Sequence, residues 1–408
     1  MKWLSEKDIT EFLQNKDFDV RKSNNARWID QKCAADIITL VADCVIEYIE
    51  GDLKKTFWRG DIQLNKYTME NVKNIFKKPE TDEPLAQSEY DKFFAQPLEL
   101  LAYSGVLEKE KIKNKNYYKV KDLDILQFLA LREKNALIFL NKYIEKVLKD
   151  SEIFDVFEDF FKLQNKNTYN DLKDAFKNFT IKNTPIKGAI ECFRIFIKII
   201  NPLAYHRNIQ GTEGGRLSRD KISYDMLMYN RVNFRDVYMN KPKGMTRIQY
   251  AEQMGISLNS TYTIYLSRKA KRILRLFNEN YRNNRTEIYD ERHINDLATN
   301  IHHIFPEADY PEICMYLENM IALTPTQHLN YAHPNGNTQI VDEAYQHICL
   351  IAKSGSIKEN LENDDIETIY DFKNFVFVLY TGFEKDIFKK IDPMDFESLI
   401  REINLCYK

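Results

Sequence analysis

Residues 301–328 read IHHIFPEADYPEICMYLENMIALTPTQH. They lie in a window, from His293 to His347, that holds six of the seven histidines of the chain. Neutral imidazole is the side chain best suited to bind a metal ion and to accept a proton near neutral pH. An adjacent histidine pair, a later asparagine and a further histidine therefore predict one chemical site built from several elements.

The pattern around these residues predicts two short strands followed by a helix. Pro306 fixes φ and ends the first strand just after the histidine pair. Residues 318–325 predict a second strand that closes on a Thr-Pro signal, with proline at the first helical position. His328 falls in the first turn of that helix, and a Pro-Asn-Gly-Asn turn at residues 334–337 ends it.

Each polar residue of this segment has an expected role. We interpret His302 as a metal ligand from the first strand, His303 as a general base and His328 as a ligand from the helix. Asn319 ties the loop together, coordinates the ion, or does both. Adjacent strand residues point to opposite faces, so His302 and His303 serve one site only if the strand is locally irregular. His333 either contacts a phosphate or packs at the helix end.

Composition sets limits on the other functions. The chain has 408 residues, 44% hydrophobic and 29% charged, and a net charge of −2, which allows two or three packed domains and excludes a polycation. Its six cysteines form no Cys-x-x-Cys pair, which argues against a zinc ribbon and for reduced thiols. The N-terminus lacks the apolar core of a signal peptide, so we expect a cytoplasmic protein without a membrane partner.

The N-terminal third predicts three helices and a basic hairpin. The helices cover residues 34–49, 68–77 and 88–104, the last either kinked or divided at Pro97. Residues 106–120 predict a β-hairpin with a lysine-rich turn. This order is typical of a winged-helix module, in which the third helix enters the DNA major groove, and also fits an unrelated small α+β domain.

The middle of the chain predicts long helices and one polar loop. Helical patterns cover residues 123–150, 153–177 and 186–200, and a glycine-bearing loop covers residues 206–243 before a helix restarts at Thr246. Residues 267–285 are strongly basic and lead into the histidine window. An acidic stretch at residues 359–371 precedes a helical C-terminus.

The histidine window suits phosphodiester hydrolysis. A phosphodiester is an anion and resists attack by an anion, so a divalent ion is needed to neutralise the phosphate and the leaving 3′ oxygen. His303, neutral near pH 7, would take the proton from the attacking water, leaving 5′-phosphate and 3′-hydroxyl ends. We expect Mg²⁺, or another divalent ion such as Mn²⁺.

At residues 301–338 the chain resembles the HNH (ββα-metal) catalytic module of type II restriction endonucleases. The residues that carry the likeness are HHIFP, LEN at residues 317–319, LTPTQH at residues 323–328 and AHP at residues 332–334. ARWIDQKC at residues 26–33 and GRLSR at residues 215–219 also look like segments of these enzymes. The subgroup it resembles is type IIS, MboII-like, which reads a short asymmetric site and cuts a few bases away. Many HNH enzymes have Asp where this chain has His302, so softer ions are also allowed.

The resemblance implies metal binding by His302 and His328, with Asn319 as an alternative ligand, and catalysis by His303 with Asn319. The expected function is cleavage of double-stranded DNA at or near a short site. The sequence contains no methyltransferase glycine motif and no P-loop, so a companion methyltransferase acts separately. A monomer and a transient dimer on DNA are both open.

The fold expected is α+β, predominantly helical and multidomain. The four predicted segments are a winged-helix-like DNA-recognition domain at residues 1–122, a helical middle domain at residues 123–285, an HNH module at residues 286–345 and a C-terminal helical segment at residues 346–408.

Candidate DNA contacts share positive charge or hydrogen-bonding amides, and arginine and glutamine are the side chains that read guanine and adenine edges. They are Arg21, Lys22, Arg27, Gln31, Lys32, Arg216, Arg219, Arg268, Arg272 and His333.

Three alternatives stay open. A homing, nicking or toxin-type HNH nuclease would share the chemistry with looser specificity. A DNA-binding regulator with an inactive nuclease fold would bind without cutting. Asp30-Gln31-Lys32 superficially matches the end of a PD-(D/E)xK nuclease motif but lacks its central and upstream acids.

Overall fold

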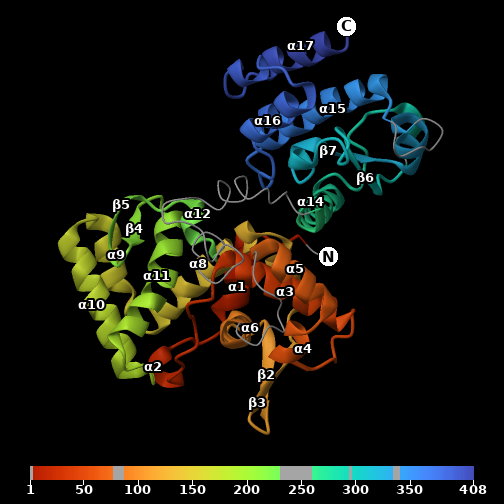
Figure 1. The fold of residues 1–408 in the computed structure, drawn as a ribbon. Helices are drawn as coiled ribbons and strands as arrows, with labels where there is room; N and C mark the ends of the chain where they lie inside the picture. The colour runs from red at the N-terminus through yellow and green to blue at the C-terminus, as the bar shows by residue number, and fades with distance from the viewer. Residues whose placement is uncertain (1–2, 77–86, 230–259, 294–295, 334–340) are drawn as a thin grey trace. The chain divides into compact units, whose positions relative to one another are not determined.

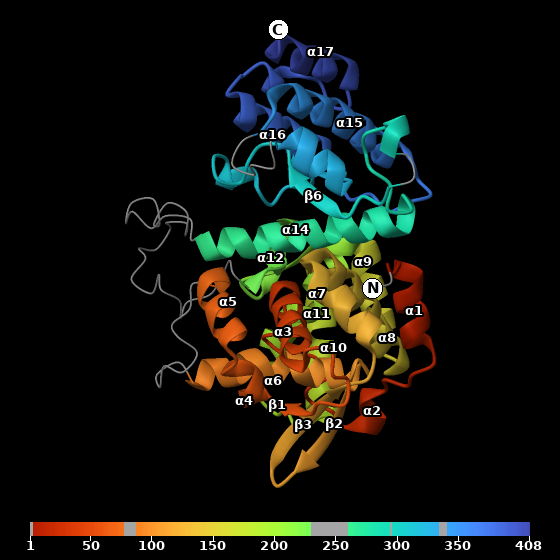
Figure 2. The same ribbon diagram turned by 90° about the vertical axis from the view of Figure 1, so that its right-hand side faces the viewer.

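The computed structural model describes residues 3–76, 87–229, 260–293, 296–333 and 341–408. This part of the chain is mostly helical, with three small antiparallel sheets (Figures 1 and 2). The expectation of a predominantly helical α+β protein is confirmed. The restart at Thr246 lies outside the described residues.

The chain forms two compact units. One contains residues 4–257, and the other contains residues 258–408 together with residues 1–3. Trp3 belongs to the second unit because its indole packs edge-on against Phe277 and its Nε1 donates to Glu367 at 3.0 Å. The units are coarser than the four segments expected from the sequence, whose functions stay predictions.

The first half of the N-terminal unit has the helices and hairpin that the sequence predicts. The third predicted helix is continuous through Pro97. The hairpin turns at Lys113 and Asn114, both with positive φ, as a two-residue turn with right-handed strand twist requires. A two-residue strand pairs with the far side of the hairpin, giving the order β1-β3-β2. The elements are α1 (Glu6–Gln14), α2 (Val20–Ser23), α3 (Ala35–Ile49), β1 (Phe57–Trp58), α4 (Arg59–Gln63), α5 (Lys66–Phe76), α6 (Gln87–Tyr103), β2 (Leu107–Ile112) and β3 (Lys115–Val120).

The second half of this unit corrects two predictions. The helix expected at residues 123–150 is broken at Arg132, whose backbone is extended. Asn135 stabilises the break, because its Nδ2 donates to the Phe128 carbonyl and its Oδ1 accepts from Arg132. The pattern at residues 153–177 also divides, at the left-handed Gln164. The elements are α7 (Leu123–Leu131), α8 (Glu133–Asp150), α9 (Phe154–Leu163), α10 (Lys166–Asn183) and α11 (Ala189–His206).

The loop expected at residues 206–243 is wrong in its described part. Residues 210–221 form a hairpin, β4 (Gln210–Glu213) and β5 (Arg216–Lys221), followed by the short helix α12 (Tyr224–Leu227). Asn201 of α11 holds the hairpin, accepting from Thr212 N at 2.8 Å and donating to its carbonyl at 3.0 Å. Residues beyond 229 in this predicted loop lie outside the described residues.

The C-terminal unit surrounds a small sheet with helices. Its hydrophobic core joins residues of every long helix to both strands. The elements are α14 (Ser260–Tyr281), β6 (Asn300–His303), η5 (Leu317–Asn319), β7 (Met320–Leu323), the π-helix η6 (Gln327–Ala332), α15 (Glu343–Glu362), α16 (Phe372–Phe383) and α17 (Phe396–Cys406).

A buried ion pair connects the sheet to α15. Glu287 and Lys353 are almost completely buried, and Lys353 Nζ lies 3.0 Å from Glu287 Oε2. Glu287 also accepts from the backbone N–H of Ala322 in β7 at 2.9 Å, and Lys353 donates to Tyr370 at 2.7 Å. Burial alone would raise the pKa of Glu287, yet the charges of Lys353 and Arg282 lower it.

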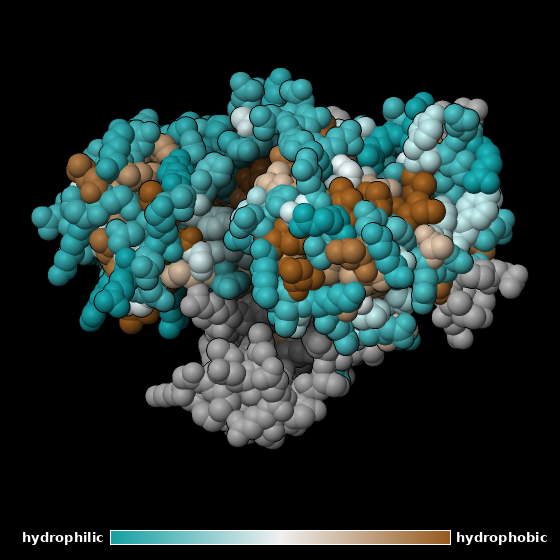
Figure 3. Space-filling view, turned by 90° about the horizontal axis from the view of Figure 1, so that it is seen from above, coloured by the Kyte–Doolittle hydropathy of each residue, from teal (hydrophilic) through white to brown (hydrophobic). Residues whose placement is uncertain are grey.

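One face of the molecule shows how polar and apolar residues are distributed (Figure 3). The face in Figure 3 is mostly hydrophilic, with smaller hydrophobic patches, which is normal for a folded chain. No helix among the described residues has the length and apolar character needed to cross a lipid bilayer.

Removing Lys353 should be costly. In Lys353→Ala the Glu287 carboxylate stays buried without its nearest cation, which typically costs about 3–5 kcal/mol of unfolding free energy. Urea unfolding measures the change. Lys358→Ala on the same helix, where the lysine is half exposed and pairs with Glu362 at 4.0 Å, should change stability by less than about 1 kcal/mol. Equal losses in the two variants would contradict the importance of the buried pair.

Glu318 should make the protein less stable as pH rises. Burial raises the pKa of Glu318 to about 7, although its Oε1 accepts from Asp371 N at 2.7 Å. Between pH 4.5 and about 7 the unfolded chain loses this proton first, so stability falls with rising pH. Glu318→Gln keeps the acceptor and removes the charge. It should raise stability by roughly 3 kcal/mol at about pH 8 and by much less at about pH 5. Thermal melts at the two pH values test this, and an equal gain at both would refute it.

Candidate metal centre and general base

Two paired strands position the histidine pair. β6 and β7 are antiparallel, with His302 opposite Ile321 and His303 opposite Met320. The pairing is regular over all four positions, so the local irregularity that we expected is not found. Consecutive side chains therefore leave the strand on opposite faces.

The helix after β7 begins where the sequence predicts. Thr324 N donates to Gln327 Oε1 at 3.0 Å, and Gln327 N donates to Thr324 Oγ1 at 3.2 Å. This reciprocal capping fixes the direction in which the chain leaves the strand. The helix then continues as the π-helix η6, in which hydrogen bonds join residues five apart. His328 and His333, five residues apart, therefore lie about one turn from each other.

Three imidazoles meet at this corner. One ring nitrogen from each of His302, His328 and His333 lies within 4.8 Å of the others. In a tetrahedral site with metal–nitrogen bonds of 2.0–2.1 Å, the nitrogens would be roughly 3.3 Å apart, so small side-chain rotations would close the cluster. Three histidines around one ion leave a fourth position open for water or substrate. The cluster thus has the donor set of a catalytic metal site.

Burial favours the neutral, metal-binding form of His302 and His328. Desolvation, followed by the neighbouring His333 and His328, holds the pKa of His302 well below its ordinary value. Desolvation and the charge of His333 also lower the pKa of His328. A neutral imidazole has a free lone pair, which is what coordination requires.

Asn300 is a residue that the sequence analysis missed. Its amide nitrogen lies 3.3 Å from His328 Nδ1. An amide at this position can orient the His328 ring by hydrogen bonding to the nitrogen that does not hold the ion. A signal existed, because Asn300 is two residues before His302 and therefore shares its face of the strand.

His303 lies among different partners. Its Nε2 is 2.9 Å from the Cys314 carbonyl oxygen. A carbonyl can only accept, so Nε2 carries the proton and Nδ1 keeps its lone pair. Glu307 is 3.7 Å from Nδ1, and Ser267 of α14 donates to the same carboxylate at 3.2 Å. Desolvation and the charge of Lys271 lower the pKa of His303, which favours the neutral base.

One lysine, Lys271, influences the pKa of both the base and the metal-ligand cluster. The charge of Lys271 on α14 contributes to lowering the pKa of His302, His303 and His328. Its Nζ lies 3.9 Å from Glu307 Oε2. The base and the ligands thus share one electrostatic neighbourhood although they leave the strand on opposite faces.

Asn319 ties the loop between the strands. Its Oδ1 accepts from Phe305 N at 2.9 Å, and its Nδ2 donates to the Phe305 carbonyl at 3.0 Å. The side chain is completely buried. Of the two roles left open by the sequence, these contacts favour the clamp over metal coordination.

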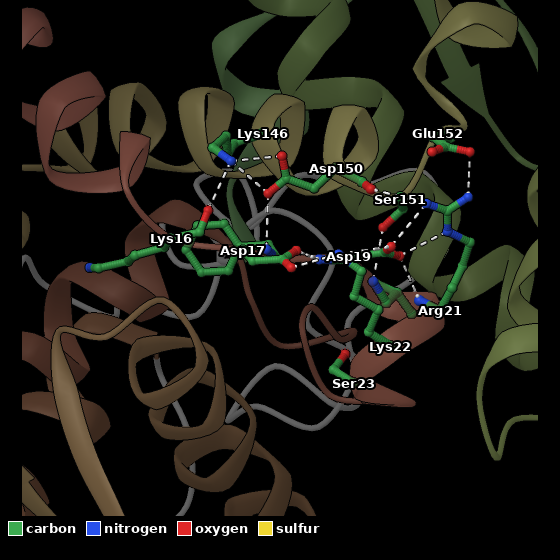
Figure 4. Close-up of polar contacts among 12 residues, drawn as sticks. Lys16, Asp17, Asp19, Arg21, Lys22, Ser23, Lys146, Asp150, Ser151 and Glu152 are labelled. Carbon is green, nitrogen blue, oxygen red and sulfur yellow. Dashed lines mark hydrogen bonds and ion pairs between the residues drawn. The ribbon is translucent and has the colours of Figure 1, made fainter.

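The predicted DNA contacts near the N-terminus have partners within the protein (Figure 4). Arg21 donates to Asp19 and, at 2.5 Å, to Glu152. Lys22 lies 2.7 Å from Asp17. These charges are largely balanced by acids, two of them only a few residues away.

The other predicted contacts divide into two groups. Lys32 is buried and bonded to Glu89 and Tyr229, and Arg27 pairs with Asp30, so the residues of the rival PD-(D/E)xK motif have separate structural partners. Gln31 and Arg272 are partly exposed, and Arg27 is exposed despite its ion pair. Arg216 and Arg219 on β5 and Arg268 on α14 are also exposed.

Comparisons with known proteins do not assign this chain to a family. No protein-family model, no curated protein and no solved structure matches the chain. The interpretation of this site therefore depends on its own residues.

Replacing His333 should weaken metal binding. His333→Ala removes one of three donors, and the affinity for Mn²⁺ or Co²⁺ should fall by more than the 10–100-fold typical of losing an orienting residue such as Asn300. Isothermal titration calorimetry measures the metal affinity of each variant. His347→Ala is the control, because His347 bonds Asn404 and stacks on Tyr407 away from the cluster. Unchanged affinity in His333→Ala would exclude His333 as a ligand.

Proposed function

We propose that the protein is a metal-dependent DNA endonuclease of the HNH type, acting in type II restriction. The observation that carries the proposal is the three-histidine cluster. His303, the residue after His302, leaves the strand on the opposite face and keeps an unprotonated Nδ1. The substrate would be double-stranded DNA, cleaved at or near a short site in the type IIS manner, with a separate methyltransferase protecting the host.

Each side chain has a defined part in this reaction. His303 would accept a proton from water at Nδ1, while the Cys314 carbonyl holds the Nε2 proton and fixes the ring. His302, His328 and His333 would hold the ion. When bound, a divalent ion that accepts imidazole ligands, such as Mn²⁺, would supply positive charge for the phosphate and the leaving oxygen; three imidazoles suit such an ion better than Mg²⁺, which prefers oxygen ligands. The ammonium of Lys271 adds positive charge to the same neighbourhood and helps to keep His303 neutral.

Glu307 and Ser267 are positioning residues for the base. Ser267 donates to Glu307 at 3.2 Å and lies 3.4 Å from His303 Nε2. The carboxylate in turn lies close to Nδ1 and to Lys271. These contacts limit rotation of the His303 ring. Its Nδ1 therefore accepts the proton from one fixed side.

Removing the base should abolish cleavage while sparing the metal. His303→Ala should lower the cleavage rate on plasmid DNA with Mg²⁺ or Mn²⁺ by roughly 10²–10⁴-fold. Titration of Mn²⁺ should show nearly unchanged metal affinity, and EDTA should stop the wild-type reaction. His347→Ala is the matched control, because that histidine lies outside the cluster. Ample cleavage by His303→Ala would refute the assignment of the base.

The products separate this proposal from its rivals. Discrete fragments that DNA ligase can rejoin indicate restriction with 5′-phosphate ends. A smear indicates a homing or toxin-type nuclease with loose specificity. DNA binding without cleavage in either metal indicates a regulator with an inactive nuclease fold.

A further inference from the structure

A cleft of about 610 Å³ lies in the N-terminal unit, in a part of the molecule that the nuclease chemistry does not use. One face of α6 forms one wall, and the hairpin β2–β3 beside it, extended in Figures 1 and 2, forms the other. Trp58 and Arg59, where β1 meets α4, also line the cleft. The cleft thus lies between a helix and a projecting hairpin.

The acids that line the cleft are neutralised. Glu99 accepts from Tyr118 at 2.6 Å, from Asn116 at 2.7 Å and from Lys109 at 2.7 Å. Asp91 pairs with Arg59. Neither carboxylate therefore presents uncompensated negative charge to an incoming ligand.

Two cations remain available. Lys92 on α6 is exposed and makes no ion pair with any residue that the structure describes. Lys115 at the start of β3 is exposed and lies 4.0 Å over the Trp58 ring, a contact that leaves its charge intact. They lie on opposite walls, so an anion between them would be attracted from both sides.

Gln96 of α6 supplies a hydrogen-bond donor to the cleft. Gln96 is 7% exposed and lines the cleft. Its Oε1 accepts from Lys32 N at 2.8 Å, whereas its Nε2 has no partner among the described residues. This nitrogen is not among the fully buried unpaired atoms of the described residues, so it is open to a ligand in the cleft. This is an observation independent of the two lysines.

We propose that this cleft binds one strand of duplex DNA, with backbone phosphates between Lys92 and Lys115. This rests on the proposed function, which makes DNA the substrate. A strand of the duplex can pass between a helix that enters one groove and a hairpin that follows the backbone, and lysine is a common phosphate contact. Gln96 Nε2 donates from the floor to an acceptor of the same strand. In this proposal the cleft makes the DNA contact that the sequence had assigned to Arg21, Lys22 and Lys32.

The test measures the salt dependence of DNA binding by the full-length protein in EDTA. Fluorescence anisotropy follows a labelled mixed-sequence duplex of about 30 base pairs between about 50 and about 200 mM NaCl. Each lost phosphate contact flattens the slope of log K against log salt concentration by about 0.9. Lys92→Ala/Lys115→Ala should therefore bind more weakly and lower the slope by about 2. Both residues are exposed, so the variant should fold.

A control pair keeps the change in net charge equal. Lys7→Ala/Lys162→Ala removes two exposed lysines of α1 and α9, neither of which lines the cleft. This variant should retain the wild-type slope. Lys92→Glu alone should weaken binding further than Lys92→Ala, because it places a negative charge against the phosphate.

The outcomes distinguish this inference from the nuclease proposal. If the wild type binds the duplex and the cleft variant keeps its affinity and slope, the cleft is not the DNA site. The same holds if the control pair loses as much as the cleft pair, or if only a duplex RNA of the same sequence shows the change in slope. Plasmid cleavage by the wild type in Mg²⁺ or Mn²⁺ tests the nuclease separately and is unaffected by these results.

Discussion

The candidate site depends on one completely buried amide. Asn319 bonds both backbone groups of Phe305, so the end of β6 and the start of β7 are held together across an intervening loop. Its Nδ2 also lies 3.4 Å from the carbonyl of Ile313, next to Cys314, whose own carbonyl fixes the proton on His303. Without this side chain the Phe305 N–H and C=O would be buried and unpaired, at about 1–3 kcal/mol each. One amide thus stabilises the strand pair and sets the geometry of the base.

Much of the candidate site could be predicted from the sequence because its signals are local. The Thr-Pro start of the helix is capped by Thr324 Oγ1, which accepts from Gln327 N, and His302 and His328 meet as expected. His333 was expected to contact a phosphate or to pack at the helix end. A spacing of five residues does not return to one face of an α-helix, so the sequence contains no signal that it joins His328. The π-helix η6 changes that spacing, and the residue pattern does not distinguish a rare π-helix from an α-helix. The sequence also could not show that β6 is regular at His303. The partner of His303 Nε2 is a loop carbonyl, that of Cys314, and not a group made accessible by an irregular strand.

The sequence predicts about as much of the fold as it does of the candidate site. Apolar periodicity located most helices, whereas the break at Arg132 depends on Asn135, which bonds to the Phe128 carbonyl before the break and to the Arg132 side chain. The hairpin at residues 210–221 was taken for a loop because its strands are short and polar, and it is held by Asn201 from another element. Local patterns predict elements well when the stabilising partner is nearby in sequence. They fail when that partner is brought close only by folding.

The same argument explains the basic residues. Arg21 looks like a DNA contact in a basic run, but Glu152, 131 residues away, accepts one of its hydrogen bonds. Lys92 and Lys115 attracted no attention in the sequence, yet folding leaves them exposed on two walls of one cleft. Charge available to a ligand is therefore a property of the folded unit. On the two proposals, the cleft in the N-terminal unit holds DNA and the histidines of the C-terminal unit cut it. A chain that places these tasks in separate compact units can cleave DNA outside the site that it reads, which is how a type IIS enzyme acts.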